Sequence, residues 1–580
     1  MCGIFFYLYS YQSDPSQVKV TNNFHNLHSQ FSKIKHRGPD QSVIRICDGI
    51  FYGFHRLAIV GLDGDGGQPF CGRTTVMANA EIFNYKELIR DHDLMVSHSS
   101  DCAVIEPLYL KYGMEKMLRL LDGDFVIVLV DGDNIYFARD SIVGIGVRPL
   151  FYIYDKNTGE FGIASEKKAL IKHDESDQYI RPVLPATYMV LNRKSFELKT
   201  YSYAIMPSEV FLADDEKTVI EKLRLLFFSA VEKRLKCCDR EIGFFLSGGF
   251  DSSAIFAMSC YIIYKQNMTK LFDVHAFTIA IEGDRETEDV KHAKILVRYL
   301  QERYPSLKIH HHIIQISTEE IINTISKLIY YFETPDCTTI RAGLPNYLMA
   351  RAVKETSCTV IFSGEGSDEL FNGYIYSRLI KYATSATSAD SEKSETSELS
   401  ESINIQDDTD RLLDQLYMYD VLRADRATAS NSLELRVPFL DRYLIQYVRS
   451  IDPKYKLCNE RIEKYIIRKS LEDLLPTSVC WRKKEAFSDS VSIKDGVNMI
   501  ESLKKFADRF IQDHEMASMT YTHMIPRTKE ECYYRKIYEA YYAGVLENCI
   551  SGFWMPPAKL VGNITDPSAT VLKCYNDTSI

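Results

Sequence analysis

The sequence predicts an α/β protein of two domains, because its two parts show different secondary-structure patterns. Residues 1–205 consist of short β-prone segments that are separated by turns and interrupted by two helical stretches. From residue 206 to residue 560, long helical segments alternate with short apolar strands, which is typical of a doubly wound parallel sheet covered by helices on both faces. A length of 580 residues also exceeds what one hydrophobic core supports. We therefore predict domains at 2–205 and 206–560, followed by a loosely held, irregular tail at 561–580.

Composition and charge exclude several classes of protein. The chain is 46% hydrophobic and 26% charged, as expected for an ordinary globular protein. Its net charge of −10 argues against a nucleic-acid binder that depends on phosphate contacts. It has no apolar run long enough to span a membrane, and its first ten residues lack the basic leader of a signal peptide. We expect a cytoplasmic protein that binds neither nucleic acid nor membrane.

The cysteine and histidine patterns predict no metal site. Fourteen cysteines are scattered without a C-x-x-C pair, which is typical of reduced thiols in a cytosolic enzyme. His310, His311 and His312 are consecutive, but neighbouring residues of a strand point to opposite faces. We therefore expect that these three side chains do not converge on one ion.

In the first domain, hydrophobic periodicity predicts strands and two helices. The strands are expected at 2–9, 51–60, 74–78, 125–130 and 135–138. The helices are expected at 24–34 and 101–112, and glycine-rich turns at 64–67 and 144–146.

In the second domain, the same reasoning predicts a repeated strand–helix alternation. Strands are expected at 273–281, 308–316 and 358–363. Helices are expected at 219–235, 288–304, 318–331, 343–355 and 411–426, and the chain is expected to be helical from 499 to 554. The polar segment 336–341 is expected to lie between two of these helices.

The stretch 241–253, EIGFFLSGGFDSS, is the most informative part of the second domain. An apolar strand ends at Ser247-Gly248-Gly249, and a helical pattern begins at Asp251. This order of strand, glycine turn and helix start directs free backbone N–H groups and the positive end of a helix dipole toward an anion. The glycines let the backbone approach a phosphate, and Asp251 is suited to hold Mg²⁺ against it. A plain βα turn with a helix cap is the alternative, but the complete SGGxDSS string favours a phosphate site.

Another polar string follows a predicted strand of the same sheet. Residues 363–369, SGEGSDE, contain three acids interleaved with two glycines. Such residues are unsuited to a hydrophobic core but suited to the edge of a site that binds a nucleotide with Mg²⁺. Ligands of parallel α/β sheets bind at the carboxyl ends of the strands. We therefore expect this string to lie beside the loop of residues 241–253.

The N-terminus carries a candidate nucleophile. If Met1 is removed, Cys2 holds a thiol and a free α-amine on one residue, so the nucleophile brings its own base. A cysteine at position 2 is by itself more often a simple buried residue.

Together, these strings resemble the glutamine-hydrolysing asparagine synthetase family. MCGI at 1–4 with HRGPD at 36–40 is similar to amidotransferases that use an N-terminal cysteine, and SGGFDSS resembles the loop of enzymes that split ATP into AMP and pyrophosphate. The resemblance runs from Cys2 to about Ser568. It implies an αββα sandwich glutaminase of the N-terminal nucleophile type, followed by an ATP-pyrophosphatase domain with helical additions.

The resemblance also implies an activity. It is the ATP-dependent synthesis of L-asparagine from L-aspartate, with ammonia released from L-glutamine and β-aspartyl-AMP as the intermediate. ATP and Mg²⁺ would be the cofactors, and a homodimer the assembly.

For the glutaminase half, the resemblance implies Cys2 as nucleophile and an oxyanion hole at Asn79 and Ala80. The glutamine-binding residues would be Arg56, Leu57, Ala58, Ile59, Val60, Asn79, Ala80, Glu81 and Asp101. A surface ion pair is the alternative role of Arg56 and of Asp101.

For the synthetase half, it implies Glu365 as the base that assists ammonia attack and Lys484 as the cation that steadies charge on pyrophosphate. The ATP and pyrophosphate site would contain Leu246, Ser247, Gly248, Gly249, Asp251, Ser252, Ser253, Ile279, Ser363 and Gly364. The aspartate and adenylate site would contain Thr338, Thr339, Arg341, Glu365 and Asp368, and the Mg²⁺ ligands would be Asp251 and Asp368. A solvated surface charge is the alternative for Lys484, and plain core for Ile279.

Three stretches depart from the family pattern. Ala80 stands where glycine is usual, so a positive φ there would cost stability. The turn at 140–147 is longer than usual. Residues 383–410 are rich in serine, threonine and acids and free of aromatics, so we predict a disordered surface insertion, with a phosphorylation or partner role as the alternative.

Two rival functions remain at this point. One is a related amide-forming, adenylating ligase that acts on another carboxylate. The other is a non-catalytic nucleotide-binding relative, against which the intact Cys2, Asp251, Glu365 and Lys484 argue. A plain glutaminase would not explain the ATP-site strings.

Overall fold

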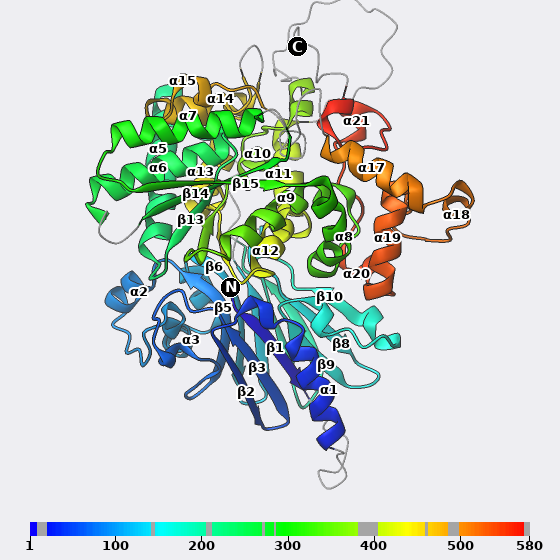
Figure 1. The fold of residues 1–580 in the computed structure, drawn as a ribbon. Helices are drawn as coiled ribbons and strands as arrows, with labels where there is room; N and C mark the ends of the chain where they lie inside the picture. Colours follow the sequence, from blue (N-terminus) through cyan, green and yellow to red (C-terminus); the bar gives the residue numbers. More distant parts are fainter. Residues whose placement is uncertain are drawn as a thin grey trace, which may run out of the picture.

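The structure is a computed structural model of the chain, shown in Figure 1, with the first domain below the second. It describes residues 1–8, 20–140, 145–204, 211–268, 273–283, 286–380, 404–458, 462–484 and 498–572. Most of the predicted insertion, part of the long turn at 140–147 and the end of the tail lie outside the described residues.

The first domain contains two antiparallel sheets of six strands each. One has the order β10-β8-β9-β1-β3-β2, with strands Ile180–Pro182, Phe151–Asp155, Glu160–Ala164, Gly3–Leu8, Ile50–Arg56 and Gln41–Cys47. The other has the order β12-β11-β7-β6-β5-β4, with strands Glu197–Ser202, Thr187–Asn192, Asn134–Arg139, Gly123–Asp131, Thr75–Ile82 and Phe70–Cys71.

Helices cover the outer faces of these sheets. Helix α1 (Val20–Ser32) packs Leu27 and Phe31 against β1 and β3. Helices α3 (Ile105–Tyr112) and α4 (Met114–Leu120) pack against β5 and β6. Between the sheets, apolar side chains of β1 and β3 meet those of β6 and β7. The layers are therefore helix, sheet, sheet and helix, which confirms the predicted αββα sandwich.

The second domain is built on a parallel sheet in the order β15-β14-β13-β16-β17. Its strands are Ile309–Ile316, Val274–Ile281, Ile242–Phe245, Val360–Phe362 and Glu434–Arg436. One face carries α5 (Glu216–Lys236), α6 (Phe250–Lys265) and α7 (Glu288–Arg303), and the other carries α8 (Thr318–Phe332) and α9 (Cys337–Val353). Helices on both faces confirm the predicted doubly wound arrangement.

The helical additions complete this domain. They include α11 (Ile405–Gln415), α12 (Asp420–Ala429), α13 (Arg442–Ser450), α14 (Tyr465–Leu471), α17 (Met499–Phe510), α18 (Asp513–Ala517), α19 (Lys529–Tyr542), α20 (Leu546–Cys549) and α21 (Ala558–Val561). Tyrosines of α19 pack against α8, so this C-terminal helix belongs to the core of the domain.

Several predicted elements have other bounds in the structure. The helix expected at 411–426 is divided between α11 and α12, and the helical stretch expected at 499–554 is divided into α17, α18, α19 and α20. The strand expected at 51–60 ends at Arg56, and residues 57–60 continue without strand pairing. The segment 336–341 does not lie between helices, because α9 already begins at Cys337. Asp336 caps this helix by accepting a hydrogen bond from the Thr339 N–H, 2.8 Å away.

The end of the predicted insertion is also ordered structure. Residues 405–410 form the start of α11, which Asn404 caps through the Gln406 N–H. Ile405 and Thr409 are buried, and the ammonium group of Lys456 contacts Gln406 and Thr409. The mostly polar composition gave no sign of this amphipathic helix. Its narrow buried face is stabilised by contacts with other parts of the domain.

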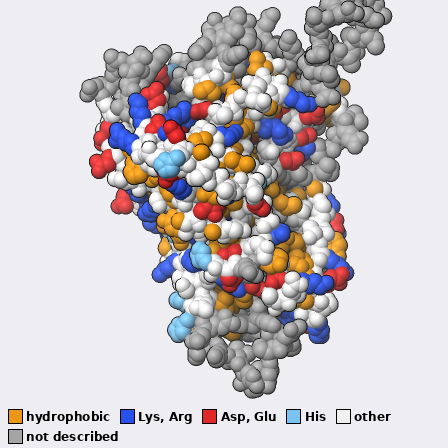
Figure 2. Space-filling model, turned by 90° about the vertical axis from the view of Figure 1, so that its right-hand side faces the viewer, with side chains coloured by type: hydrophobic (Ala, Val, Ile, Leu, Met, Phe, Trp, Pro, Cys, Tyr) orange, Lys and Arg blue, Asp and Glu red, His pale blue; other side chains and the backbone are white. Residues whose placement is uncertain are grey.

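Among the described residues, no helix combines the length and the apolar character that crossing a bilayer requires. On the face shown in Figure 2, acidic and basic side chains are interspersed and form no continuous basic stripe. This surface agrees with the net charge of −10.

Candidate active sites

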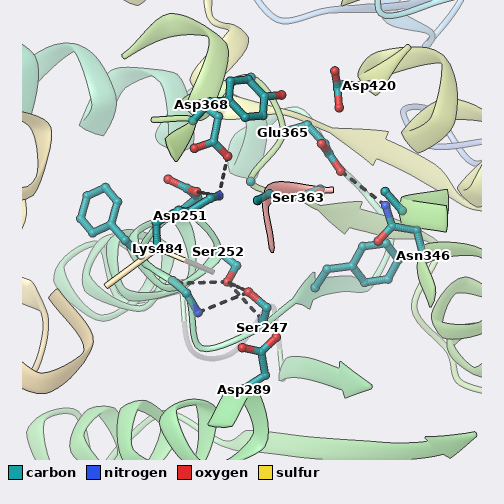
Figure 3. A pocket seen from close by; sticks show the side chains of 18 of the residues that line it. Ser247, Asp251, Ser252, Asp289, Asn346, Ser363, Glu365, Asp368, Asp420 and Lys484 are labelled. Carbon is teal, nitrogen blue, oxygen red and sulfur yellow. Dashed lines mark hydrogen bonds and ion pairs between the residues drawn. The ribbon is translucent and has the colours of Figure 1, made fainter. Parts of the chain in front are cut away.

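The larger candidate site is a cavity of about 260 Å³ at the carboxyl ends of β13, β14 and β16. The structure brings most of the predicted nucleotide and aspartate residues together there. Those that line it are Leu246, Ser247, Gly249, Asp251, Ser252, Ile279, Thr338, Arg341, Ser363, Gly364, Glu365, Asp368 and Lys484. Figure 3 shows many of these side chains converging from separate elements.

Three predicted residues do not line this cavity. Gly248 has φ +69°, and a Cβ there would lie 2.6 Å from the Asp289 carbonyl oxygen, so this glycine serves the turn and its contact with α7. Ser253 is fully buried in α6. The Thr339 hydroxyl donates to Asp336 at 2.7 Å and belongs to the cap of α9.

The loop after β13 exposes the start of helix α6 to the cavity. Gly249 is the N-cap of α6 and has no side chain to satisfy the first N–H groups of the helix. Ser247 and Ser252 are joined through their hydroxyls at 3.1 Å, which holds the loop closed around this helix end (Figure 3). The arrangement leaves backbone donors and a positive dipole end for an anion.

Asp251, Asp368 and Lys484 line the charged side of the cavity, and the buried Lys464 pairs with both acids without lining the cavity itself. The Lys464 ammonium lies 2.7 Å from Asp251 and 2.6 Å from Asp368, and Lys484 lies 2.6 Å from Asp368. Burial alone would raise the pKa of Asp368, but the two ammonium groups hold this pKa well below its usual range. The same carboxylates keep the pKa of Lys484 above its usual value despite burial. Asp368 is therefore ionised and Lys484 charged at neutral pH.

Glu365 occupies a different part of the cavity. Its carboxylate accepts hydrogen bonds from Arg423 at 2.7 Å and from the Asn346 amide at 3.4 Å. Burial raises the pKa of Glu365, although the Arg423 guanidinium opposes this shift. A carboxylate with a raised pKa is a better proton acceptor than an ordinary one.

Arg341 is already paired within the protein. Its guanidinium contacts Glu530 at 2.6 Å and Asp566 at 2.9 Å, and it donates to the Ser568 hydroxyl at 2.9 Å. Asp566 and Ser568 belong to the segment predicted as a loosely held tail. These contacts show that the described part of the tail, up to residue 572, closes one side of the cavity.

Several residues of this site were not predicted from the sequence. Lys464, Ser367, Arg423 and Asn346 contact the predicted acids directly. Lys464 lies in αL conformation immediately before α14, and Arg423 lies within α12. A basic residue inside a helical pattern carries no local signal of such a contact.

The second candidate site surrounds Cys2. A small cleft of about 20 Å³ is lined by all nine residues predicted to hold glutamine. They are Arg56, Leu57, Ala58, Ile59, Val60, Asn79, Ala80, Glu81 and Asp101. Met1 also lines the cleft, and its side chain is only 1% exposed. With Met1 in place, the cleft is filled by the chain itself.

Asn79 lies against the Cys2 backbone. Its side-chain oxygen accepts a hydrogen bond of 2.8 Å from the Cys2 N–H, which would be the α-amine after Met1 is removed. The Asn79 Nδ2 group is buried and has no hydrogen-bond partner among the described residues. An unpaired buried donor beside a thiol has the position of an oxyanion-hole group. The Cys2 sulfur accepts a hydrogen bond of 3.5 Å from the Leu57 N–H, and burial raises the pKa of the Cys2 thiol.

The structure answers the question posed by Ala80. This residue lies in β5, paired with Phe125 of β6, and is not among the described residues with positive φ. Extended backbone accepts any L residue, so alanine costs no strain at this position.

Buried acids stand on the other side of the cleft. Asp101 accepts the Ile82 N–H at 2.7 Å, and burial raises the pKa of Asp101 to about 6. Glu81 contacts Arg436 of β17 at 2.9 Å, and burial raises the pKa of Glu81 well above its usual value. Arg56 donates to the carbonyl oxygens of Gly61 and Asp63 and is not part of a surface ion pair.

Helix α12 lines the larger cavity and reaches the surroundings of Cys2 through Arg37. Arg423 pairs with Glu365 in the larger cavity. Two residues later, both oxygens of Asp425 accept hydrogen bonds from Arg37, at 2.9 and 3.0 Å, and Arg37 also donates to the Cys2 carbonyl at 3.2 Å. Arg426 pairs with Glu166 of the first domain at 2.8 Å. One helix thus connects the surroundings of Cys2 with those of Glu365.

Comparison with known proteins assigns a family to each half of the chain. The family model described as asparagine synthase matches residues 222–547, and that described as glutamine amidotransferase domain matches residues 1–222. The chain is 35% identical to a probable asparagine synthetase [glutamine-hydrolyzing] of Acanthamoeba polyphaga mimivirus, over 99% of this chain and 100% of that protein. It is 36% identical to the asparagine synthetase [glutamine-hydrolyzing] of Rattus norvegicus, over 94% and 96%. This chain therefore belongs to the asparagine synthase family.

Proposed function

We propose that this chain synthesises L-asparagine from L-aspartate, with L-glutamine as nitrogen donor and ATP converted to AMP and pyrophosphate. The observation that carries the proposal is the presence of two chemically different sites in one chain. One is a cleft around an N-terminal cysteine, and the other is a charged cavity at the carboxyl edge of a parallel sheet. Helix α12 connects their surroundings.

In the first site, Cys2 attacks the glutamine amide after Met1 is removed. Its freed α-amine, held by Asn79, takes the thiol proton. The Asn79 Nδ2 group and the backbone N–H of Ala80 stabilise the oxyanion. Arg56 and Asp101 orient the substrate carboxylate and α-ammonium group. Ammonia leaves, and water then releases glutamate from the thioester.

In the second site, ATP binds with its phosphates at the start of α6. The L-aspartate side-chain carboxylate attacks the α-phosphorus, and pyrophosphate leaves with its charge stabilised by Lys484 and Lys464. A carboxylate is a poor electrophile until AMP is attached as a leaving group. Thr338 and Arg341 line the part of the cavity where the aspartate would lie.

The residues present also suit Mg²⁺. The carboxyl groups of Asp251 and Asp368 face the same Lys464 ammonium group, and Mg²⁺ commonly binds one or two carboxylates together with substrate phosphates. When bound, the ion would neutralise phosphate charge and orient the polyphosphate chain. Asp251 and Asp368 would hold it, with Lys464 neutralising the charge that remains.

Glu365 completes the reaction in the larger cavity. It accepts a proton as ammonia attacks the acyl-adenylate, and its raised pKa suits this role. Ammonium is not a nucleophile, so ammonia has to travel between the sites inside the protein. The buried contacts of α12 and β17 between the two sites support such a sheltered path.

We further propose a division at residues 2–205 and 206–560, a cytoplasmic location and a homodimeric assembly. The change from antiparallel sandwich to parallel sheet supports the division. The scattered cysteines support a reducing compartment.

The two-site scheme is tested by Cys2→Ala. We expect this variant to lose asparagine synthesis with glutamine and to retain synthesis with ammonia, because only the first site is changed. Cys71→Ala, on the surface of the first domain, is the matched control and should retain both activities. Loss of both activities in a folded Cys2→Ala protein would contradict the scheme.

The identity of the acid is tested by ATP–pyrophosphate exchange with a series of carboxylic acids. Aspartate should support the fastest exchange. Faster exchange with another acid would favour the rival adenylating ligase, and no exchange with any acid would favour a non-catalytic nucleotide binder.

A further inference from the structure

Three polar side chains meet at the amino edge of the parallel sheet, the edge opposite the nucleotide cavity. Glu241 directly precedes β13, His275 is the second residue of β14, and Cys358 lies two residues before β16. These are adjacent strands, since β13 pairs with both β14 and β16. One possible ligand atom from each residue lies within 4.8 Å of the other two.

We propose that Glu241, His275 and Cys358 form a binding site for a divalent ion of the zinc class. A carboxylate oxygen, an imidazole nitrogen and a thiolate are a common set of zinc ligands, and the fourth position is left for water. Among the described residues, this is the one group of three such side chains whose ligand atoms lie so close together. The site is independent of asparagine synthesis.

The geometry needs little adjustment to hold an ion. Tetrahedral zinc with ligands at about 2.0–2.3 Å places the ligand atoms about 3.3–3.8 Å apart, so the three side chains would close by about 1 Å. Glu241 is exposed and can move, whereas Cys358 is buried just before β16. The Glu241 carboxylate presently accepts a hydrogen bond from the Ser357 hydroxyl, beside Cys358, which directs it toward the thiol.

Neighbouring histidines hold the ring of His275 in place. Nδ1 of His275 lies 3.1 Å from Nε2 of His312, and the His310 ring stacks on His275 with centroids 4.8 Å apart. Orienting partners of this kind are typical around metal-binding histidines. His311 points to the other face, where it contacts the Thr278 hydroxyl at 2.8 Å. The run of three histidines therefore does not bind an ion itself, but two of its members support a ligand.

The position of the site suggests what the ion does. Arg240, next to Glu241, contacts Ala58 and Asp40 of the first domain at 2.8 and 3.0 Å. An ion at this edge would join three strands near the contact between the domains. We expect it to stabilise the folded chain, because ligands that bind only the native state raise its stability.

Cobalt(II) titration of the metal-free full-length protein tests the site, with absorption spectroscopy as readout. We expect one equivalent to give the thiolate-to-cobalt charge-transfer band and the visible bands of tetrahedral cobalt. Cys358→Ser should abolish the charge-transfer band, and Glu241→Gln, an exposed change with little folding risk, should weaken binding about tenfold or more. His312→Gln should weaken it by about tenfold, since it removes an orienting contact.

His311→Gln is the matched control, one residue away and on the opposite face, and should bind cobalt like the wild type. Zinc alone should raise the unfolding temperature of the wild type and of His311→Gln, but not that of Cys358→Ser. The proposal is overturned if the wild type shows no cobalt–thiolate band, or if Cys358→Ser and Glu241→Gln bind cobalt as tightly as the wild type.

Discussion

The two candidate sites balance their buried charges in different ways. In the larger cavity, Asp368 faces two ammonium groups, and its pKa stays well below the usual range. In the cleft around Cys2, burial raises the pKa of Asp101 to about 6. The larger cavity has a volume of about 260 Å³, whereas the cleft has about 20 Å³ and is lined by the buried Met1. The buried charges of the larger cavity are already paired within the protein, whereas in the proposed mechanism Asp101 gains its counter-charge only from the substrate, after Met1 has been removed.

The largest effect is expected from removing the lysine shared by the two acids. Lys464→Met leaves Asp251 and Asp368 with Lys484 alone, so the charge balance of the larger cavity is lost. We expect ATP–pyrophosphate exchange to fall by about a hundredfold or more, as for loss of a preorganised electrostatic group. Glutamine hydrolysis should change far less.

Lys469→Met is the control for this variant. Lys469 lies on α14, which follows Lys464 directly, and pairs with Glu472 at the surface. The Lys469→Met protein should catalyse ATP–pyrophosphate exchange at the wild-type rate. Equal rates for Lys464→Met and wild type would show that Lys464 is not part of the site.

The contact between the two regions is tested by Asp425→Asn. Asp425 and Arg37 are fully buried, so the change leaves a buried guanidinium with one partner fewer. We expect a loss of about 3 kcal/mol in the free energy of unfolding. Ammonia-dependent synthesis should be less affected than glutamine-dependent synthesis, because Arg37 contacts Cys2.

Urea denaturation measures the first effect, and paired synthesis assays measure the second. Asp473→Asn, which removes an exposed ion pair with Arg224, should cost less than about 1 kcal/mol. A similar small loss for Asp425→Asn would mean that the buried pair does not join the domains.

The pKa contrast predicts a difference in pH dependence. In the proposed mechanism Asp101 binds the substrate ammonium group only when ionised, so we expect kcat/KM for glutamine hydrolysis to rise with pH through about 6. At pH 5 we expect about one tenth of the plateau value, since one unit below the pKa a tenth of the group is ionised. Titration of Asp368 should cause no such step in ATP–pyrophosphate exchange between pH 5 and 7, because the neighbouring Lys464 and Lys484 keep the Asp368 carboxylate ionised.

Asp101→Asn serves as the control for this profile. It should lower kcat/KM for glutamine and remove the step near pH 6. Persistence of the step in this variant would assign it to another group.

The smallest effect is expected from Ala80→Gly, which restores the residue usual in the family. Since Ala80 lies in a strand without positive φ, glycine relieves no strain and should cost about 0.5–1 kcal/mol of stability. Glutamine hydrolysis should stay within about twofold of wild type. A large gain in activity would show that the alanine methyl group obstructs the cleft.

Much of the fold followed from local patterns. The strand–helix alternation correctly predicted the parallel sheet and the cavity at its carboxyl edge. The start of α9 was missed because the polar residues of 336–341 were interpreted as a segment between helices, whereas α9 begins at Cys337. The Asp336 cap was present in the sequence and would have marked the correct start. The start of α11 was missed because its composition is mostly polar. The few residues of its buried face form a recognisable pattern only once their tertiary contacts are known.

The amino-acid sequence by itself determined the residues whose chemistry is recognisable over a few positions, such as Cys2, the loop after β13 and the acids at 363–369. Within each of these strings the residues are neighbours in the sequence, so one strand end or one turn is enough to place their side chains close together. Only the tertiary structure decided that Lys464 stands between two acids, that α12 reaches the surroundings of both sites and that Glu241, His275 and Cys358 meet. Those contacts join residues far apart in the chain, and strand order and register, not local propensity, set such distances.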